Sequence, residues 1–206
     1  DEMSSRGLGD VYKRQGDSNV LIWGFSGCGL THLLEACSRR AQSPLAYLPL
    51  RDALDLDPSL VIANLESVKL VCIDDVELIA GRSDWELAIF HLYNRLRDLG
   101  HMLLLASHEK PTAIDFSLPD LRSRVLGSVI YKIDHLSDTQ KAQALILRAR
   151  ERGMVMSVDV AEQVVKKAPR RMKALFEWLD KLDSASLKYQ KKLTPRFVKQ
   201  VLDGEL

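Results

Sequence analysis

Short apolar runs alternate with longer segments of helical periodicity over the first two thirds of the chain. The runs span residues 20–23, 45–50, 68–73, 102–106 and 129–133. Because they are short and rich in Val, Ile and Leu, they predict strands of a parallel sheet that is covered on both faces. From Asp84 to Leu99, apolar residues recur at spacings of three and four, which predicts one face of a helix. The pattern therefore predicts an α/β core around a five-stranded parallel sheet.

Only helical periodicity follows residue 136. Ser137 and Gln140 have the spacing of a capping box, which predicts a helix that runs to about Arg152. Thr194 and Pro195 are an N-cap and a first-turn proline, and they predict the start of the last helix. This part of the chain is therefore expected to contain helices and no strands.

These patterns predict two domains, an α/β core at residues 16–136 and a small helical domain at residues 137–206. Residues 1–15 show neither periodicity nor a targeting pattern. They resemble translated sequencing-adapter sequence, so we interpret them as a non-native or disordered tail that carries no function. The genuine sequence is then expected to start near Gly16 and to lack its own N-terminus.

The composition is ordinary for a globular protein, with 46% hydrophobic and 28% charged residues. No run of about 18 apolar residues occurs, so no membrane span is expected. The cysteines (Cys28, Cys37 and Cys72) are odd in number and lack C-x-x-C spacing, which favours reduced thiols in a cytoplasmic protein.

Charge is divided unevenly along the chain. Residues 1–136 carry 14 basic and 19 acidic side chains, whereas residues 137–206 carry 15 basic and 9 acidic. A basic domain is suited to nucleic acid or to an acidic partner, but an ordinary solvated helical surface explains the same excess. The sequence shows no aromatic residues interleaved for single-stranded nucleic acid, and direct DNA binding is not expected.

The most informative motif directly follows the first apolar run. Its sequence, Gly-Phe-Ser-Gly-Cys-Gly-Leu-Thr, has the frame of a phosphate-binding loop, G-x-x-x-x-G-K-S/T, with Leu30 in place of the lysine. Thr31 stands where a hydroxyl ligates Mg²⁺. Loss of the lysine contact costs about 1.5–3 kcal/mol, so we expect a weak site for ADP or ATP. The residues expected to line it are Gly24, Phe25, Ser26, Gly27, Cys28, Gly29, Leu30 and Thr31.

A pair of acids ends the third apolar run. Asp74 would hold Mg²⁺ through water, and Asp75 stands where a carboxylate orients the attacking water. Two acids after a strand are also common as a simple loop start. Their distance from the glycine loop, about 45 residues, favours the chemical interpretation.

The order and spacing of these motifs resemble AAA+ ATPases of the DnaA branch, and within it the DnaA-related regulators of replication initiation. The resemblance covers about residues 19–203. The matching segments are Leu70–Ala80, Trp85–Leu96, Leu118–Val125, Ile130–Lys141 and Lys192–Leu202. This resemblance implies a P-loop core followed by a helical lid domain.

The resemblance also implies roles that the spacing alone does not. Arg124 matches the arginine finger, a cation offered to the γ-phosphate held by a neighbouring subunit, and Arg122 is a weaker neighbour. By its local sequence alone, Arg124 is a surface arginine before a strand. Lys173 matches the second sensor, where the family generally has arginine, and His108 matches the first, but each also fits an ordinary solvated residue. His32 matches a histidine common in these loops. We include Lys173, His108 and His32 in the expected nucleotide site.

Three functions are compatible with these features. The first is a regulator that presents Arg124 to ATP bound by DnaA and stimulates its hydrolysis, which represses replication initiation. The resemblance then implies DnaA and the sliding clamp as partners, bound ADP, and possible homo-oligomers, although residues 1–15 lack the clamp-binding motif. The second is a DnaA-related ATPase or loader, against which Leu30 argues. The third is a DNA-binding initiator, which would need a DNA-binding domain after the lid.

Overall fold

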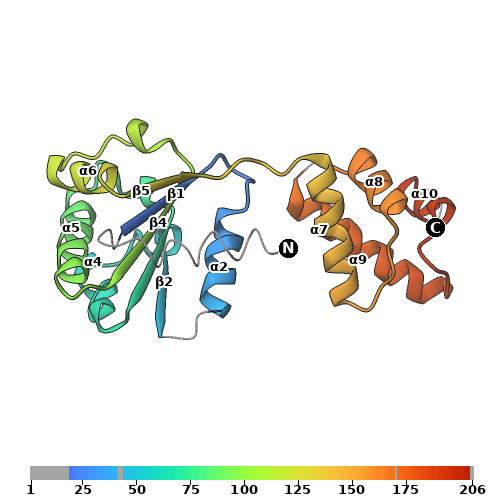
Figure 1. Cartoon of the computed structure of the whole chain (residues 1–206), viewed down its shortest axis with the longest axis horizontal. Helices are drawn as coiled ribbons and strands as arrows, with labels where there is room; N and C mark the ends of the chain where they lie inside the picture. Colours follow the sequence, from blue (N-terminus) through green and yellow to red (C-terminus); the bar gives the residue numbers. More distant parts are fainter. Residues whose placement is uncertain (1–18, 41–43, 170, 205–206) are drawn as a thin grey trace. The chain divides into compact units, whose positions relative to one another are not determined.

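The computed structural model describes residues 19–40, 44–169 and 171–204 (Figure 1). Contacts divide the described chain after Asp134 into an α/β unit and a helical unit. The predicted tail at residues 1–15 lies outside the described residues. The strands are β1 (Asn19–Trp23), β2 (Leu45–Pro49), β3 (Leu70–Asp74), β4 (Met102–Ser107) and β5 (Val129–Lys132). The α-helices of the α/β unit are α2 (Leu30–Arg40), α3 (Leu50–Ala53), α4 (Pro58–Val61), α5 (Ser83–Asp98) and α6 (Pro119–Leu126).

All five strands are parallel, in the order β2-β3-β4-β1-β5, which confirms the predicted sheet. Helix α2 covers one face, and α4 and α5 cover the other (Figure 1). Parallel strands have their carboxyl ends at one edge of the sheet, which is where ligands bind in such folds. The ends of β1, β3 and β4 therefore bring the glycine loop, the paired acids and Ser107 together at this edge.

Successive side chains of β3 point to opposite faces of the sheet and pack into two different apolar clusters. Val71 and Ile73 lie in the cluster beneath α5, while Cys72 lies in the cluster beneath α2. All three are fully buried. Burial of each aliphatic side chain contributes about 1.5–3 kcal/mol, so a polar residue at any of these positions would weaken the sheet. Two-sided burial explains why the strand appears in the sequence as an unbroken apolar run.

The helical unit has its own apolar core and well-defined helix ends. Its helices are α7 (Asp138–Glu151), α8 (Val158–Lys167), α9 (Met172–Tyr189) and α10 (Pro195–Leu202). The predicted capping box is confirmed, since the Gln140 amide donates to the Ser137 hydroxyl and the Ser137 amide donates to the Gln140 side chain. The Phe197 amide donates to Thr194 at the predicted start of α10. Within the described residues, none of the helices is long and apolar enough to cross a bilayer.

Helix α6 is absent from the sequence-based expectation, which described Arg124 only as a residue before the last strand. Only Leu121 and Val125 mark its apolar face, and eight residues are too few for a clear periodic signal. The helix exists because these two side chains insert into the core beneath α5. Arg124 therefore projects from a packed helix.

The buried cysteine of β3 gives a test of this core. Burial raises the pKa of the Cys72 thiol to about 12, and only the thiolate reacts readily with alkylating agents. At pH 8 the thiolate fraction is then about 10⁻⁴. We expect iodoacetamide to leave Cys72 unmodified in the native protein and to label it after unfolding in guanidinium, as measured by mass spectrometry. Native labelling at the rate of the unfolded chain would contradict this packing.

Candidate functional site

The glycine loop closes tightly over the sheet edge at Gly24. A Cβ atom on Gly24 would lie 2.3 Å from the carbonyl oxygen of Ile133 and 2.7 Å from Sγ of Cys28. Its amide donates to the Ser107 carbonyl across 3.1 Å. Gly29 has φ of +97°, a conformation that side chains disfavour, just before α2 begins. The loop therefore needs glycine at both ends.

Leu30, which replaces the lysine of the loop motif, belongs to the core. It is the first residue of α2 and only 1% exposed. It lies in the apolar cluster that also contains Val20, Leu34 and Leu104. Hydrophobic burial thus anchors the start of α2 at the position where a charged side chain would serve a phosphate.

Asp74 is the buried centre of the site. Its Oδ2 atom accepts hydrogen bonds from the Thr31 hydroxyl at 2.8 Å and the Tyr47 hydroxyl at 3.0 Å, and its Oδ1 atom accepts the Asp75 amide at 3.0 Å. Burial and the charge of Asp74 raise the pKa of Tyr47 above its ordinary value, so that hydroxyl stays protonated and donates. These bonds offset the cost of removing a carboxylate from water.

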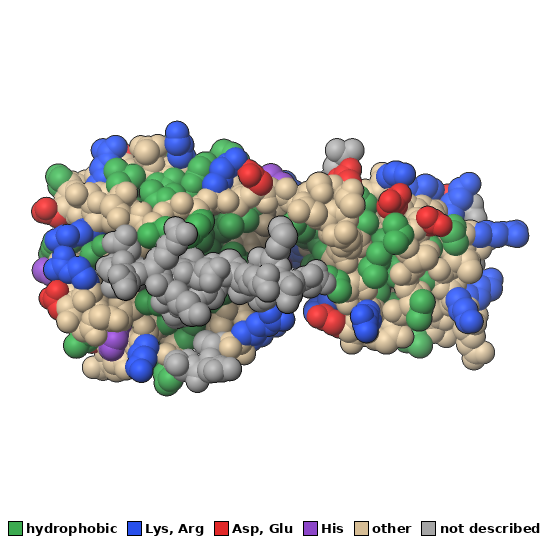
Figure 2. Space-filling view, in the orientation of Figure 1, with side chains coloured by type: hydrophobic (Ala, Val, Ile, Leu, Met, Phe, Trp, Pro, Cys, Tyr) green, Lys and Arg blue, Asp and Glu red, His purple; other side chains and the backbone are tan. Residues whose placement is uncertain are grey.

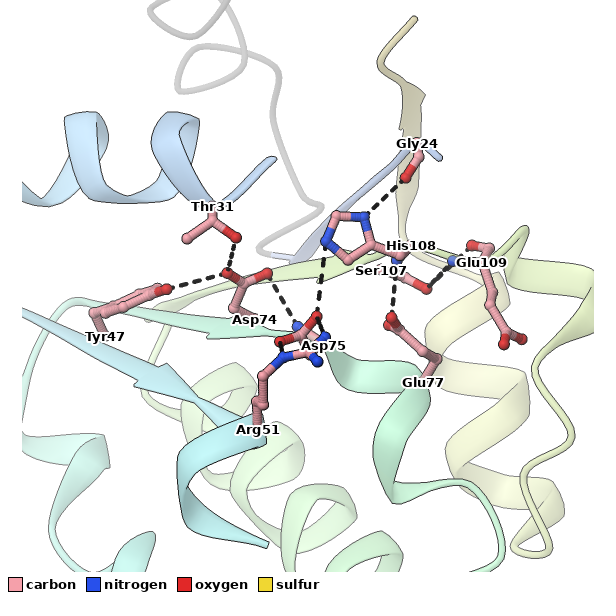
Figure 3. Close-up of polar contacts among 10 residues, drawn as sticks. All are labelled: Gly24, Thr31, Tyr47, Arg51, Asp74, Asp75, Glu77, Ser107, His108 and Glu109. Atoms are coloured by element: carbon pink, nitrogen blue, oxygen red, sulfur yellow. Dashed lines mark hydrogen bonds and ion pairs between the residues drawn. The ribbon is translucent and has the colours of Figure 1, made fainter. Parts of the chain in front are cut away.

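Asp75 is held by Arg51 and His108 of the same chain (Figure 3). Nε and a terminal nitrogen of Arg51 each lie 3.1 Å from an Asp75 oxygen, a bidentate pair. Nε2 of His108 lies 3.7 Å from the same carboxylate. The Asp75 backbone is left-handed, with φ of 58°, which an aspartate tolerates at a turn. This contact engages both oxygens of the carboxylate that was expected to orient water.

His108 links the loop to the acids, as Figure 3 shows. Its Nδ1 atom lies 3.1 Å from the Gly24 carbonyl, and its amide donates to Oε1 of Glu77 at 3.1 Å. The neighbouring Ser107 is fully buried and bonds to the backbone of Glu109. The structure thus brings the predicted first-sensor residue to the loop and to Asp75.

Oxygen donors in this arrangement suit a hard cation. Thr31 and Asp74 offer a hydroxyl and a carboxylate that already share a hydrogen bond, and Mg²⁺ prefers such ligands together with phosphate oxygens. In the part of the chain that the structure describes, no group of three or more His, Cys, Asp or Glu residues could hold a metal ion. Thr31 and Asp74 are the residues that would hold such an ion together with phosphate oxygens.

Comparison with known proteins identifies the family. Residues 138–202 match the family model described as Hda, lid domain. Over 186 residues the chain is 43% identical to an uncharacterized protein of Haemophilus influenzae, a match that covers 88% of this chain and 80% of that protein. The chain belongs to the Hda/DnaA-related AAA+ proteins.

Solved AAA+ structures show the same fold. Domain III of the Thermotoga maritima replication initiation protein DnaA has a TM-score of 0.76 at 18% identity, covering 98% of this chain and 91% of that one. AMPPCP-bound DnaA from Aquifex aeolicus has a TM-score of 0.69 at 21% identity, covering 89% and 62%. The Thermotoga maritima RuvB branch migration motor has a TM-score of 0.72 at 14% identity, covering 96% and 65%. These likenesses confirm the expected fold.

Other predicted site residues of this AAA+ chain lie farther from the acids or on the surface. Phe25 is 59% exposed and packs edge-on against Trp23. Ser26 and Gly27 are exposed, and His32 is exposed on α2 beside Glu35. In this AAA+ site, the structure therefore joins Gly24, Thr31, Asp74, Asp75 and His108 through direct contacts.

Lys173 is exposed in the first turn of α9, within the lid of the AAA+ fold. Lys and Arg side chains outnumber Asp and Glu on the face of the helical unit that Figure 2 shows, as the charge count predicted. Arg122 is exposed on α6 and Arg124 is half-buried.

Arg51 and Tyr47 are site residues that reasoning from the sequence missed. Tyr47 lies on β2, and Arg51 lies on α3, which directly follows that strand. Strand β2 pairs with β3 in register, so that Pro49 lies opposite Asp74. The available signal was a polar residue directly after a strand of a parallel sheet. A polar residue at this place can be assigned to the site only when the strand beside β2 is known. The order of strands in a sheet cannot be read from the sequence of any one strand.

The short distance between Gly24 and the Ile133 carbonyl can be tested by adding a methyl group at Gly24. Gly24→Ala should lower the free energy of unfolding by about 1–3 kcal/mol, because the new methyl group collides with a backbone carbonyl. Chemical denaturation measures the change. Ser26→Ala is the matched control on the exposed part of the loop and should stay within about 0.5 kcal/mol of wild type. Equal stabilities for the two variants would contradict the tight closure of the loop over Ile133.

Proposed function

We propose that this chain regulates replication initiation by stimulating the hydrolysis of ATP bound to DnaA. The single observation that carries the proposal is the contrast between two arginines of the α/β unit. Arg51 is bound to Asp75. Arg124 is half-buried on α6 and makes no ion pair with any described residue. A positioned, unneutralised guanidinium is the chemical requirement for an arginine finger.

Arg124 is suited to act on a nucleotide held by another molecule. It offers planar N–H donors that match the γ-phosphate oxygens and stabilise the charge that develops on them during hydrolysis. The relation to DnaA supports DnaA as the partner, because domain III of a DnaA shares this fold and offers a matching AAA+ core. Arg124 would then complete the site of a DnaA subunit across an interface between two AAA+ cores.

The chain's own site supports binding more than turnover. A DnaA of this fold is bound to AMPPCP, and in this chain a glycine loop leads into the N-terminus of α2, a place suited to phosphate. When bound, Mg²⁺ would be held by Thr31 and Asp74 and would neutralise phosphate charge. Leu30 supplies no cation, and Asp75 is engaged by Arg51 and His108. We therefore propose that ADP is retained in this site without rapid hydrolysis of ATP.

The proposal includes further partners. In this proposal the sliding clamp recruits the chain to DNA through an N-terminal motif, and the chain works in the cytoplasm. We also propose that the chain forms homo-oligomers when DnaA is not bound, through the AAA+ surfaces that would contact DnaA.

A self-sufficient ATPase or loader is the second candidate. The observation in its favour is that Thr31, Asp74 and Asp75 are all present and in contact at the loop. Turnover of ATP by the purified chain without DnaA, abolished by Asp75→Asn, would select this candidate over the first.

Arg124→Ala should lower the stimulated hydrolysis of DnaA-bound ATP by about 10³-fold or more, because an arginine finger contributes about 10³–10⁵ in rate. The measurement is single-turnover hydrolysis of ATP on DnaA, with clamp-loaded DNA and this chain carrying the clamp-binding motif of the family. Arg122→Ala is the matched control, two residues away and exposed. It should change the rate by at most about fivefold, the effect of a surface charge.

An Arg124→Ala protein that stimulates DnaA at the wild-type rate would overturn the proposed mechanism. Circular dichroism and ADP binding verify that the variant is folded. Both should be unchanged, because the described contacts of Arg124 are with Tyr93 and Ser128, away from the loop and the paired acids.

Leu30→Lys should tighten ADP binding about tenfold, or about 1.4 kcal/mol, because its ammonium can reach the phosphates while its stem remains in the apolar cluster. The same change should lower the free energy of unfolding by about 1–3 kcal/mol, since it places a polar group in the core. Titration calorimetry and thermal melting measure the two effects. Leu30→Met keeps the length without the charge and should leave affinity unchanged, so equal affinities for the two variants would refute the role of charge.

A further inference from the structure

Glu86 is a fully buried carboxylate that the nucleotide site does not use. It lies on α5 and is 0% exposed. Its Oε1 atom accepts the amides of Gly81 at 2.7 Å and Ser117 at 3.0 Å, and its Oε2 atom accepts the amide of Leu118 at 2.6 Å. Burying a charge is costly unless hydrogen bonds replace water. Here every protein partner among those described is a backbone N–H, so the carboxylate fixes the path of the chain.

Two of those amides lie at the start of α6. Leu118 is the N-cap residue of this helix and has no side-chain acceptor of its own, and Pro119 supplies no N–H at the first position. Glu86 therefore takes the part of a capping side chain from 32 residues away. An anion at this place also complements the positive end of the helix dipole.

A second contact joins the same two helices near the other end of α6. The guanidinium carbon of Arg124 lies 5.9 Å from the ring centre of Tyr93, which is 7% exposed on α5. An aromatic face attracts a guanidinium without neutralising it. The ring thus supports Arg124 and leaves its N–H groups able to bind an anion.

The two contacts have matching separations. Glu86 and Tyr93 are seven residues apart, so they share one face of α5 about 10.5 Å apart along its axis. Leu118 and Arg124 are six residues apart, about 9 Å along α6. Leu121, which lies between them, and Val125, which follows Arg124, are fully buried in the core beneath α5. Figure 1 shows α6 lying beside one end of α5.

We propose that Glu86 and Tyr93 are positioning residues for Arg124, and that α5 sets the direction in which the arginine leaves the domain. This inference rests on the proposed function for its catalytic consequence, but not for the placement of Arg124. Glu86 fixes where α6 begins, and Tyr93 restricts the rotation of the guanidinium at its far end. Misplacing a reacting group by about 1 Å can cost about a hundredfold in rate, so loss of either contact should weaken stimulation without removing the finger.

The direct test is nuclear magnetic resonance of the full chain. The ring of Tyr93 should shift the Arg124 side-chain Nε–H and CδH₂ signals upfield relative to those of the exposed Arg122. Tyr93→Leu should abolish the shift, and Tyr93→Phe, which keeps the ring, should retain it. Glu86→Gln should accelerate hydrogen exchange at the Ser117 and Leu118 amides and reduce the Arg124 shift. Absence of the shift in wild type would overturn the inference whatever DnaA does.

The kinetic test separates positioning from general stability. In the DnaA assay, Tyr93→Leu should lower the maximal stimulated rate by about tenfold to a hundredfold. The concentration that gives half-maximal stimulation should change less than about twofold, because the docking surface remains. Tyr93→Phe should recover the rate to within about threefold of wild type. If Glu86→Gln does not fold, the Tyr93 pair still decides the question.

The outcomes distinguish the two proposals. A ring-shifted Arg124 in a chain that does not stimulate DnaA would refute the proposed function and leave the placement by Tyr93 intact. Stimulation that disappears in Arg124→Ala but is unaffected by both Tyr93→Leu and Glu86→Gln would refute positioning and leave the finger intact.

Discussion

One buried carboxylate, that of Asp74, holds the functional edge of the sheet together. Its three hydrogen bonds come from the hydroxyl of Thr31 on α2, the hydroxyl of Tyr47 on β2, and the amide of Asp75. A carboxylate that is 2% exposed would be unstable without them. Asp74 therefore fixes three elements relative to one another: the start of α2 after the glycine loop, strand β2, and the turn after β3. The position of Asp75, and with it the contacts of Arg51 and His108, follows from this arrangement.

The α/β unit treats its charged groups in two contrasting ways. At the loop, charges are satisfied within the chain, since Asp75 is paired with Arg51 and Asp74 is held by its hydrogen bonds. On α6, the guanidinium of Arg124 rests on an aromatic ring and retains its charge. The first arrangement fixes the side chains of the site in one geometry and leaves few of the described charges unpaired there. The second leaves the N–H donors of a guanidinium able to bind an anion.

The sequence predicted the parts of this structure that depend on local pattern. Two-sided burial made strands such as β3 recognisable, and the glycine loop and paired acids followed from their spacing. The capping box at Ser137 was predictable because its donors and acceptors lie within four residues. The order of the strands was not, and so the contact between Arg51 and Asp75 could not be predicted. Nor could α6, because its N-terminus depends on Glu86 in another helix.

Leu30 both removes a positive charge from the phosphate-binding loop and adds a buried side chain to the core. The sequence revealed only that a charge is missing from the loop. The structure adds that the replacement fills space in the cluster of Val20 and Leu34. A return to lysine would therefore set phosphate binding against packing, because the side chain that now anchors the start of α2 would have to carry a charge. One residue thus couples two properties of the loop: a change that strengthens its hold on an anion loosens the first turn of the helix behind it, so affinity and stability vary in opposite directions at this position.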